Sequence, residues 1–362
     1  DRHTNTFYAR RHCVSVAHVS NASANCPAHL SGMTDLGSHT ELARAVAAGD
    51  RRALARAITL VESTREDHRH QADLLLESLL PVTGRSIRIG ISGVPGVGKS
   101  TFIEVFGRHV IGEGHKVAVL AVDPSSQRSG GSILGDKTRM EELGRLPDAF
   151  IRPSPTGGTL GGVARGTGEA LLLCEAAGFD VVIVETVGVG QSETAVADLV
   201  DMFVLLLSPS GGDELQGLKK GIVEIADLLV VNKADGDLAK AAGRSAAEYA
   251  SALHVLRPSS AHWTPEVLTC SAIEGRGVTE IWQQALRFAA TMKAAGAFDA
   301  RRERQARSWM WSAVDEALHA AFRADPRVQA LLGTLQDEVA SGVTTPTHAA
   351  KTLLAVFERR RV

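Results

Sequence analysis

The chain has 362 residues, of which 44 % are hydrophobic and 4 % aromatic, so a sizeable core built mainly from aliphatic side chains is expected. Its formal net charge of −2 gives no electrostatic reason to expect a nucleic-acid or membrane-surface partner. The four cysteines are isolated, which argues against a disulfide framework or a zinc site and fits a reducing cytoplasm. The sequence contains no run of 18 apolar residues, so no transmembrane helix is predicted.

The N-terminal part of the chain falls into two segments. Residues 1–32 are poor in acidic residues and lack helical periodicity. A transit peptide has this composition, but we favour a disordered extension or tag ahead of a start at Met33. Residues 33–84 are expected to be helical, because apolar residues from Leu42 onward recur at three- to four-residue spacing until Pro81.

The central part, residues 85–298, alternates between apolar runs and helical segments. The expected strands are Ser86–Ser92, Val117–Asp123, Asp180–Glu185, Met202–Leu207, Leu228–Asn232 and Val267–Ser271. Nearly continuous apolar runs are typical of parallel strands covered on both faces. The alternation therefore predicts a three-layer α/β domain with a mostly parallel sheet.

The C-terminal part, residues 299–362, carries no strand signal. Three helices are expected, at Arg301–Arg323, Pro326–Ala340 and Pro346–Arg361. The first carries an apolar stripe that includes Trp309 and Trp311, and such a stripe needs a surface to cover it. That surface is either the α/β domain or a second subunit.

The strongest motif is G-x-x-x-x-G-K-[ST], which lies between an expected strand and an expected helix. Its residues are Gly93, Val94, Pro95, Gly96, Val97, Gly98, Lys99 and Ser100, followed by Thr101. Glycines let backbone N–H groups surround phosphate oxygens, and the helix N-terminus adds the positive end of its dipole. Lys99 can reach the β- and γ-phosphates, and the hydroxyl of Ser100 can bind Mg²⁺. The motif predicts a P-loop NTPase.

Two later segments predict that the nucleotide base is guanine. Asn232, Lys233 and Asp235 form an N-K-x-D sequence directly after an expected strand. The carboxylate of Asp235 can accept hydrogen bonds from N1–H and the 2-amino group of guanine, two donors that adenine lacks, and the stem of Lys233 can cover the purine face. The loop after the last strand is expected to offer a backbone N–H to guanine O6, from Ser271, Ala272 and Ile273.

A further motif, Glu-Thr-Val-Gly, ends the strand Asp180–Glu185. Glu185 is expected to hold Mg²⁺ through a water, and the N–H of Gly188 would meet the γ-phosphate. With Lys99, these two residues are the candidate catalytic groups. Because Val189 follows instead of a water-orienting glutamine, we expect slow intrinsic hydrolysis that a partner accelerates.

Two other carboxylates lie between the P-loop and Glu185. Asp123 ends the second expected strand, and Asp136 lies in a glycine-rich segment. Both could reach Mg²⁺ or the γ-phosphate. Equally, Asp123 could be a strand-end cap and Asp136 a helix N-cap.

Together these stretches closely resemble the methylmalonyl-CoA mutase-associated GTPase family, the MeaB/ArgK group, from about Leu42 to the C-terminus. The segments that carry the resemblance are Gly93–Thr101, Ala121–Ser126, Gly131–Met140, Ile151–Pro155, Gly158–Gly162, Val184–Glu193, Gly212–Gly217 and Asn232–Asp235. The resemblance implies a GTPase that gates cofactor loading of an adenosylcobalamin-dependent acyl-CoA mutase and protects the mutase from inactivation. It also implies a homodimer formed through the C-terminal helices.

The resemblance assigns roles to individual residues as well. It implies that Ser100, Asp123 and Asp136 serve Mg²⁺ and that Glu185 anchors the second switch. It implies a further switch with Asp213 and Lys219 as its polar contacts, although the residues alone predict a plain glycine-rich connection there.

Three other functions are alternatives to this one. A nickel metallochaperone GTPase would carry clustered histidines or cysteines, which here are dispersed. Asp235 argues against an ATPase or kinase of basic amino-acid transport, because its carboxylate is expected to select guanine over adenine. A GTP-gated scaffold would show no meaningful turnover of GTP. The chain has no Asp-x-His-x-x-Gly motif, so we expect no directly ligated cobalamin.

Overall fold

The computed structural model describes seven stretches of the chain, which are residues 36–63, 65–123, 140–155, 160–186, 192–209, 220–253 and 260–358. The chain divides into two compact units, of which the first ends at Arg302 and the second begins at Glu303. The segment 1–32 lies outside the described residues. Among those residues, no helix has both the length and the apolar character needed to cross a membrane.

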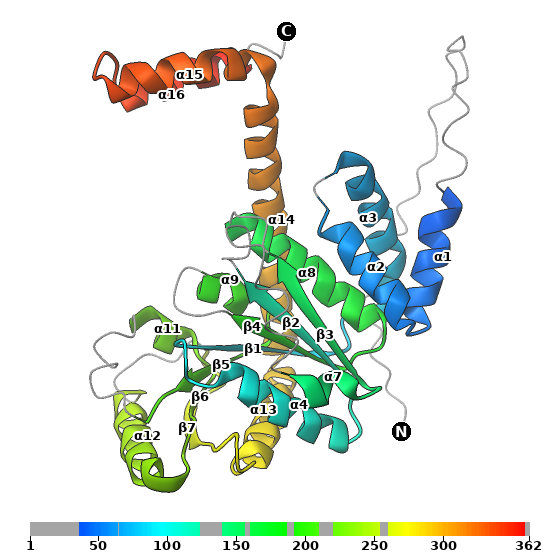
Figure 1. Cartoon of the computed structure of the whole chain (residues 1–362), viewed down its shortest axis with the longest axis vertical. Coiled ribbons are helices and arrows are strands. Elements are labelled where there is room, and N and C mark those ends of the chain that lie inside the picture. The colour runs from blue at the N-terminus through cyan, green and yellow to red at the C-terminus, as the bar shows by residue number, and fades with distance from the viewer. Residues whose placement is uncertain are drawn as a thin grey trace. The chain divides into compact units, whose positions relative to one another are not determined.

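The first unit is built on a seven-stranded sheet in which every neighbouring pair of strands is parallel (Figure 1). The strands are β1 (Ile87–Gly93), β2 (Val117–Asp123), β3 (Ala149–Pro155), β4 (Val181–Thr186), β5 (Met202–Leu207), β6 (Leu228–Val231) and β7 (Glu266–Thr269). Their order across the sheet is β3-β2-β4-β1-β5-β6-β7, so β1 is central. Every residue of β4, β5 and β6 is buried, as expected for apolar strands covered on both faces.

Strand β3 is the one strand of this sheet that the sequence does not predict. Pro153 and Pro155 discourage a strand assignment, because proline has no N–H to donate to a neighbouring strand. The structure accommodates both prolines because β3 lies at the edge of the sheet and pairs with β2 alone. The edge position results from tertiary pairing, which a local pattern does not report. The predicted three-layer α/β class is confirmed.

Helices cover both faces of this sheet (Figure 1). They are α4 (Lys99–Gly112), α7 (Glu141–Arg145), α8 (Leu160–Ala176), α9 (Ser192–Ala197), α11 (Lys220–Ile225), α12 (Ala239–Leu253) and α13 (Val278–Ala294). On one face α4 packs against α7 and α13, where the rings of Phe102 and Phe106 stack and Trp282 meets Phe106 edge-on. On the other face α8 and α9 lie against the central strands, so the sheet is enclosed between two helical layers.

Three helices precede the sheet, α1 (Leu36–Ala47), α2 (Arg51–Val61) and α3 (Glu66–Leu79), and a short 3₁₀ turn at Leu80–Val82 follows them. Helix α2 begins after Asp50, whose carboxylate accepts the backbone N–H groups of Arg52 and Ala53 at 2.7 and 2.9 Å. The buried side chains of Leu54, Ile58 and their neighbours lie at the helical spacing seen in the sequence. Both α2 and α3 contact α8, so this three-helix group packs on the α/β core.

In its described residues, up to 358, the second unit consists of helices and their short connections. Helix α14 (Ala297–Ala324) starts in the first unit and continues into the second, followed by α15 (Pro326–Ala340) and α16 (Pro346–Glu358). Asp325 caps α15 by accepting the backbone N–H of Arg327 at 2.9 Å. Hydrogen bonds from the side chain and backbone of Arg327 lower the pKa of Asp325 to about 2. The rings of Phe322 and Phe357 meet edge-on, which joins α14 to α16.

Six charged side chains gather at the amino edge of the sheet in the first unit, which we call the amino-edge network. They are Arg88, Glu175, Asp201, Asp227, Arg301 and Arg302. The carboxylates of Glu175, Asp201 and Asp227 are 0–1 % exposed, so each one requires a buried partner. Arg88 bonds Glu175 through two nitrogens at 2.9 and 3.0 Å, Arg302 pairs with Asp201 at 2.6 Å, and Arg301 pairs with Asp227 at 3.0 Å. Three positive charges thus balance three negative ones.

Two carboxylates of this network have shifted pKa values, in opposite directions. Burial raises the pKa of Glu175, but the charge and hydrogen bonds of Arg88, with the hydroxyl of Ser86, outweigh burial and leave the pKa below its ordinary value. Burial raises the pKa of Asp227, and its pairing with Arg301 does not fully reverse that rise. Glu175 is therefore the more fully compensated of the two charges.

Candidate functional site

The candidate site lies at the opposite edge of the sheet, where the carboxyl ends of the strands meet. In the register of the sheet Glu185 of β4 lies between Ile91 of β1 and Ala121 of β2. The ends of β6 and β7, which lead to Asn232 and Cys270, lie on the other side of β1. Open parallel sheets bind ligands at this edge.

The glycine-rich loop connects β1 to α4 in a conformation that needs glycine. Gly98 immediately precedes α4 with φ +94° and ψ +32°, in the left-handed region. A Cβ at Gly98 would lie 2.9 Å from Nδ2 of Asn232, and one at Gly93 would lie 2.5 Å from the carbonyl oxygen of Leu206. The loop can therefore take this path only with glycine at both positions, as the motif predicts.

Lys99 is positioned at the first turn of α4 by the loop itself. Its Nζ donates to the carbonyl oxygens of Gly93 at 2.7 Å and Val94 at 3.3 Å, and the residue is 8 % exposed. An ammonium group is thereby held inside the glycine loop beside the N-terminus of the helix. Both features favour an anionic ligand. The next residue but one, Thr101, is exposed on the first turn of the same helix.

Two of the predicted Mg²⁺ residues lie together. The hydroxyl of Ser100 donates to Oε1 of Glu185 at 3.1 Å, although the two residues are 85 positions apart in the chain. A hydroxyl beside a buried carboxylate is a set of oxygen ligands suited to Mg²⁺, so the residues present fit the ion. Asp123 ends β2 on the same side of the sheet, but its side chain lies outside the described part of the structure.

A buried hydroxyl pair behind this position was not foreseen from the sequence. Thr186, which follows Glu185 in β4, donates from Oγ1 to Oγ of Ser92 at 2.8 Å. Both residues are fully buried and lie on adjacent strands. The bond links the end of β4 to the end of β1, which positions Glu185 beside the loop. Ser92 directly precedes the glycine loop and Thr186 directly follows Glu185, and nothing in either local sequence indicates that the two hydroxyls pair.

The Asn-Lys-x-Asp segment is bonded directly to the glycine loop. Nδ2 of Asn232 donates to the carbonyl oxygen of Val97 at 2.9 Å, and Nζ of Lys233 donates to that of Gly96 at 2.7 Å. Lys233 has φ +58°, which is unusual for a residue with a side chain and indicates a constrained turn. The two motifs are therefore joined by direct hydrogen bonds.

Asp235 is held by the turn that follows β7. The hydroxyl of Ser271 donates to Oδ2 of Asp235 at 2.6 Å, and the backbone N–H of Ala272 donates to Oδ1 of Asn232 at 3.3 Å. Arg276, which the sequence did not single out, donates from Nη2 to the carbonyl oxygen of Ala234 at 3.0 Å. The side chain of the third predicted residue, Ile273, is 79 % exposed beside this turn.

Cys270 adjoins the same turn but has no role as a thiolate. Its backbone N–H continues the sheet by donating to the carbonyl oxygen of Val231 at 2.8 Å. Burial raises the pKa of its thiol to about 12, so the sulfur is protonated at neutral pH. Cys270 is a small buried core residue.

The remaining predicted residues cannot be compared with the structure. Gly188, Asp136, Asp213 and Lys219 lie outside the described residues. Their assigned roles stay predictions.

The strand–glycine loop–helix, the buried carboxylate beside Ser100 and the two loops that meet at Asp235 define a P-loop GTPase. The family model of the methylmalonyl Co-A mutase-associated GTPase MeaB matches residues 54–327. The chain therefore belongs to this family and is a GTPase.

Individual relatives agree with this assignment. The Escherichia coli K12 GTPase ArgK is 51 % identical over 276 residues, which cover 76 % of this chain and 83 % of the relative. The mouse methylmalonic aciduria type A homolog, a mitochondrial protein, is 51 % identical over 322 residues, covering 86 % of this chain and 78 % of the relative. A crystal structure titled LAO/AO transport system kinase superposes with a TM-score of 0.71 at 39 % identity, covering 89 % of this chain and 98 % of that one.

Proposed function

We propose that this GTPase uses Mg²⁺·GTP to gate cofactor loading of an adenosylcobalamin-dependent acyl-CoA mutase and to protect that mutase, with methylmalonyl-CoA mutase as the first candidate. The observation that carries the proposal is the match of residues 54–327 to the mutase-associated family. The name of the mouse relative, which refers to methylmalonic aciduria, supports the same substrate class for the partner. The chain itself ligates no cobalamin in this proposal.

The chemistry at the carboxyl edge divides among a few groups. Lys99 neutralises the β- and γ-phosphates from inside the glycine loop. Ser100 and Glu185, whose side chains are in contact, would hold Mg²⁺ together with Asp123 and Asp136. The ion would supply positive charge that neutralises the phosphates. Gly188 senses the γ-phosphate and its loss.

A slow GTPase that a partner accelerates follows from the same residues. Among the residues that the structure describes at the glycine loop, none is a glutamine, and in the sequence Val189 occupies the position after Gly188. We therefore propose that the mutase completes the hydrolytic site. Asp213 and Lys219 are proposed to relay the nucleotide state to it.

A homodimer through the second unit is part of the proposal. Helix α14 exposes large apolar side chains there, with Met310 54 %, Trp311 62 % and Leu318 54 % exposed. Exposed apolar side chains grouped on one helix favour burial against another subunit. Analytical ultracentrifugation of the full chain tests this, because Trp311→Glu should shift the dimer toward monomer.

Single-turnover hydrolysis tests the proposed function. GTP hydrolysis by the full chain is measured with and without purified methylmalonyl-CoA mutase, and with serum albumin as a control protein. We expect the mutase to raise the rate several-fold and albumin to leave it unchanged. A stimulation below about twofold by this mutase, and by any mutase captured with a non-hydrolysable GTP analogue, would contradict the proposal.

A further inference from the structure

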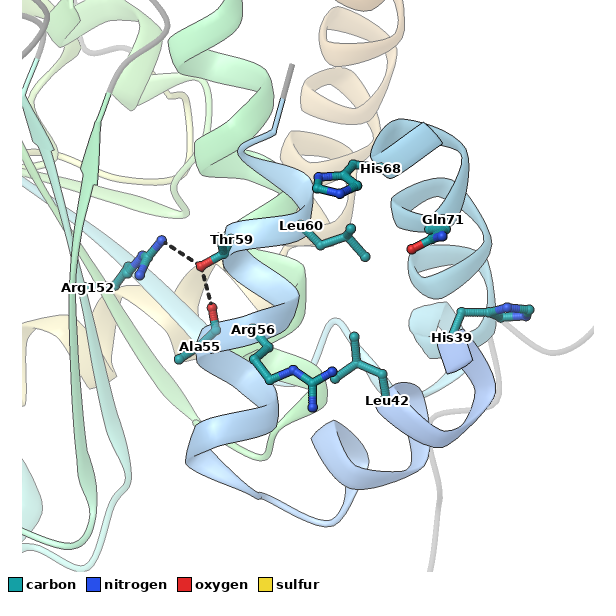
Figure 2. Close-up of a pocket in the computed structure, with 9 residues that line it drawn as sticks. All are labelled: His39, Leu42, Ala55, Arg56, Thr59, Leu60, His68, Gln71 and Arg152. Carbon is teal, nitrogen blue, oxygen red and sulfur yellow. Dashed lines mark hydrogen bonds between the residues drawn. The ribbon is translucent and has the colours of Figure 1, made fainter. Parts of the chain in front are cut away.

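A pocket of about 390 Å³ lies among the N-terminal helices (Figure 2), and none of its lining residues belongs to the nucleotide site. Its walls come from α1, α2 and α3, with Arg152 of β3 on one side. The volume falls within the roughly 300–1,000 Å³ of small-molecule sites. It equals about 13 water-sized volumes, so it has room for a small organic molecule.

The three helices present neighbouring residues to this pocket. Arg56 and Leu60 are four residues apart on α2, and Ala55 and Thr59 repeat the same spacing, so all four lie along one face of the helix. Helices α1 and α3 each contribute two residues three positions apart. This face of α2 is separate from the buried face that packs in the helical group. The pocket is therefore formed by three converging helix faces and one strand.

One part of the wall is apolar. Leu42, Ala55 and Leu60 line the pocket and are each half-buried, so their side chains remain accessible from it. Apolar surface of this kind gains free energy when a hydrocarbon group covers it. This part of the pocket fits the apolar body of a ligand.

The polar part of the wall carries positive charge without a carboxylate. Arg56 and Arg152 line the pocket, and none of its lining residues is acidic. Arg152 is already neutralised by Glu62 and bonds Thr59 at 3.2 Å (Figure 2). Arg56, in contrast, is exposed and makes no ion pair or hydrogen bond with another residue of the part of the chain that the structure describes. Arg56 is thus the charge that a ligand could satisfy.

His68 adds a donor to the same wall. Oγ of Ser63 accepts the backbone N–H of Arg65 at 3.3 Å and lies 2.9 Å from Nδ1 of His68. When the hydroxyl of Ser63 donates to Nδ1, the ring hydrogen lies on Nε2, and in that tautomer His68 can donate it to a ligand.

We infer that this pocket binds a small organic anion with an apolar body, such as a medium-chain carboxylate. The carboxylate pairs with Arg56, with His68 as a second donor, and the hydrocarbon chain covers Leu42, Ala55 and Leu60. This inference is independent of the proposed mutase partner. It assigns the N-terminal helices a ligand of their own.

Calorimetric titration of the full chain with octanoate tests the inference. We expect saturable binding at one site, and binding at least fivefold weaker for octanamide, which has the same chain but no charge. Arg56→Gln should weaken octanoate binding at least fivefold, whereas Arg56→Lys should keep most of it. Leu60→Trp, which places a larger side chain in the apolar part of the pocket, should also weaken octanoate binding.

Arg52→Gln is the matched control, because Arg52 is exposed on the same helix, one turn away, and does not line the pocket. It should bind octanoate within twofold of the wild type, and thermal melting establishes that each variant is folded. The inference is overturned by an absence of saturable octanoate binding, by octanamide binding as tightly as octanoate, or by Arg52→Gln weakening binding as much as Arg56→Gln. Its failure would leave the nucleotide site and the mutase proposal untouched.

Discussion

The two edges of the sheet use charged side chains in opposite ways. At the carboxyl edge Lys99 begins α4, and Lys233 and Asp235 lie on the loop after β6. The two lysines are bonded to backbone oxygens that a ligand could replace. At the amino edge the charges of the amino-edge network are paired with one another inside the protein. A buried pair is costly to break because the remaining charge stays desolvated, whereas an ammonium group bonded to backbone oxygens can exchange them for the oxygens of a ligand. The charges of the carboxyl edge are therefore available for ligand binding, whereas those of the amino edge stabilise the fold.

The largest effect is expected from breaking the amino-edge network. Glu175→Ala leaves Arg88 buried without its carboxylate, and removes the acceptor of the Gly84 N–H and the Ser86 hydroxyl. The free energy of unfolding should fall by about 3–5 kcal/mol, as for other buried pairs that lose one partner. Urea denaturation measures this loss, and GTP affinity below the transition should stay within about twofold of the wild type. Asp67→Ala breaks the exposed pair with Arg65 and should change stability far less.

The next effect is expected on GTP affinity, with little change in stability. Lys99→Ala removes the charge inside the glycine loop, and GTP affinity should fall about 100-fold, which corresponds to roughly 2.7 kcal/mol. The melting temperature without nucleotide should change little. Titration with Mg²⁺·GTP measures the affinity, and Lys240→Ala, at an exposed lysine of α12, is the control. An unchanged affinity in Lys99→Ala would remove the nucleotide site from this loop.

A smaller effect is expected from changing base recognition alone. Asp235→Asn offers one acceptor and one donor in place of two acceptors, so GTP affinity should fall by about 2 kcal/mol, roughly 30-fold. Xanthosine triphosphate, which carries an oxygen where guanine carries its 2-amino group, should gain affinity. Competition between the two nucleotides measures the change. An equal loss of affinity for GTP and for xanthosine triphosphate would indicate that Asp235 supports the loop instead of recognising the base.

The smallest effect concerns pH. The pKa of Glu175 lies below its unfolded value of about 4.5, so its contribution to stability is fully present above pH 4.5 and is lost as the pH falls through the folded pKa. The difference in unfolding free energy between the wild type and Glu175→Gln should therefore narrow below about pH 4.5. The pKa of Asp227 is raised in the folded state, so protonation of this carboxylate stabilises the folded state as the pH falls. Its effect on stability is therefore opposite to that of Glu175. A difference that widened in acid would contradict the assignment of the pKa shift of Glu175.

The carboxyl edge was the more predictable of the two edges. Glycine loops and the Asn-Lys-x-Asp segment are contiguous in sequence, and their spacing follows from the backbone geometry that phosphate and guanine require. Gly98 is an example of this backbone requirement, because a side chain there would collide with Asn232. Only the supporting contacts escaped prediction, such as Arg276, which joins two loops through a backbone carbonyl oxygen.

The amino edge could not be predicted in the same way. Arg88 and Glu175 are 87 residues apart, and nothing in their local sequence distinguishes them from solvent-exposed charges. Their pairing depends on how α8 lies against β1. The N-terminal pocket is equally hidden, because Arg56 and Arg152 come from segments that only the fold brings together.

The two prolines of β3 have a consequence for the behaviour of the chain at high concentration. An unpaired sheet border is a template on which a second molecule can add a strand and begin a fibre. Pro153 and Pro155 offer no N–H to an incoming strand, and the opposite border, β7, has only four residues. Both borders are therefore poor templates, which protects this protein from aggregating through its sheet.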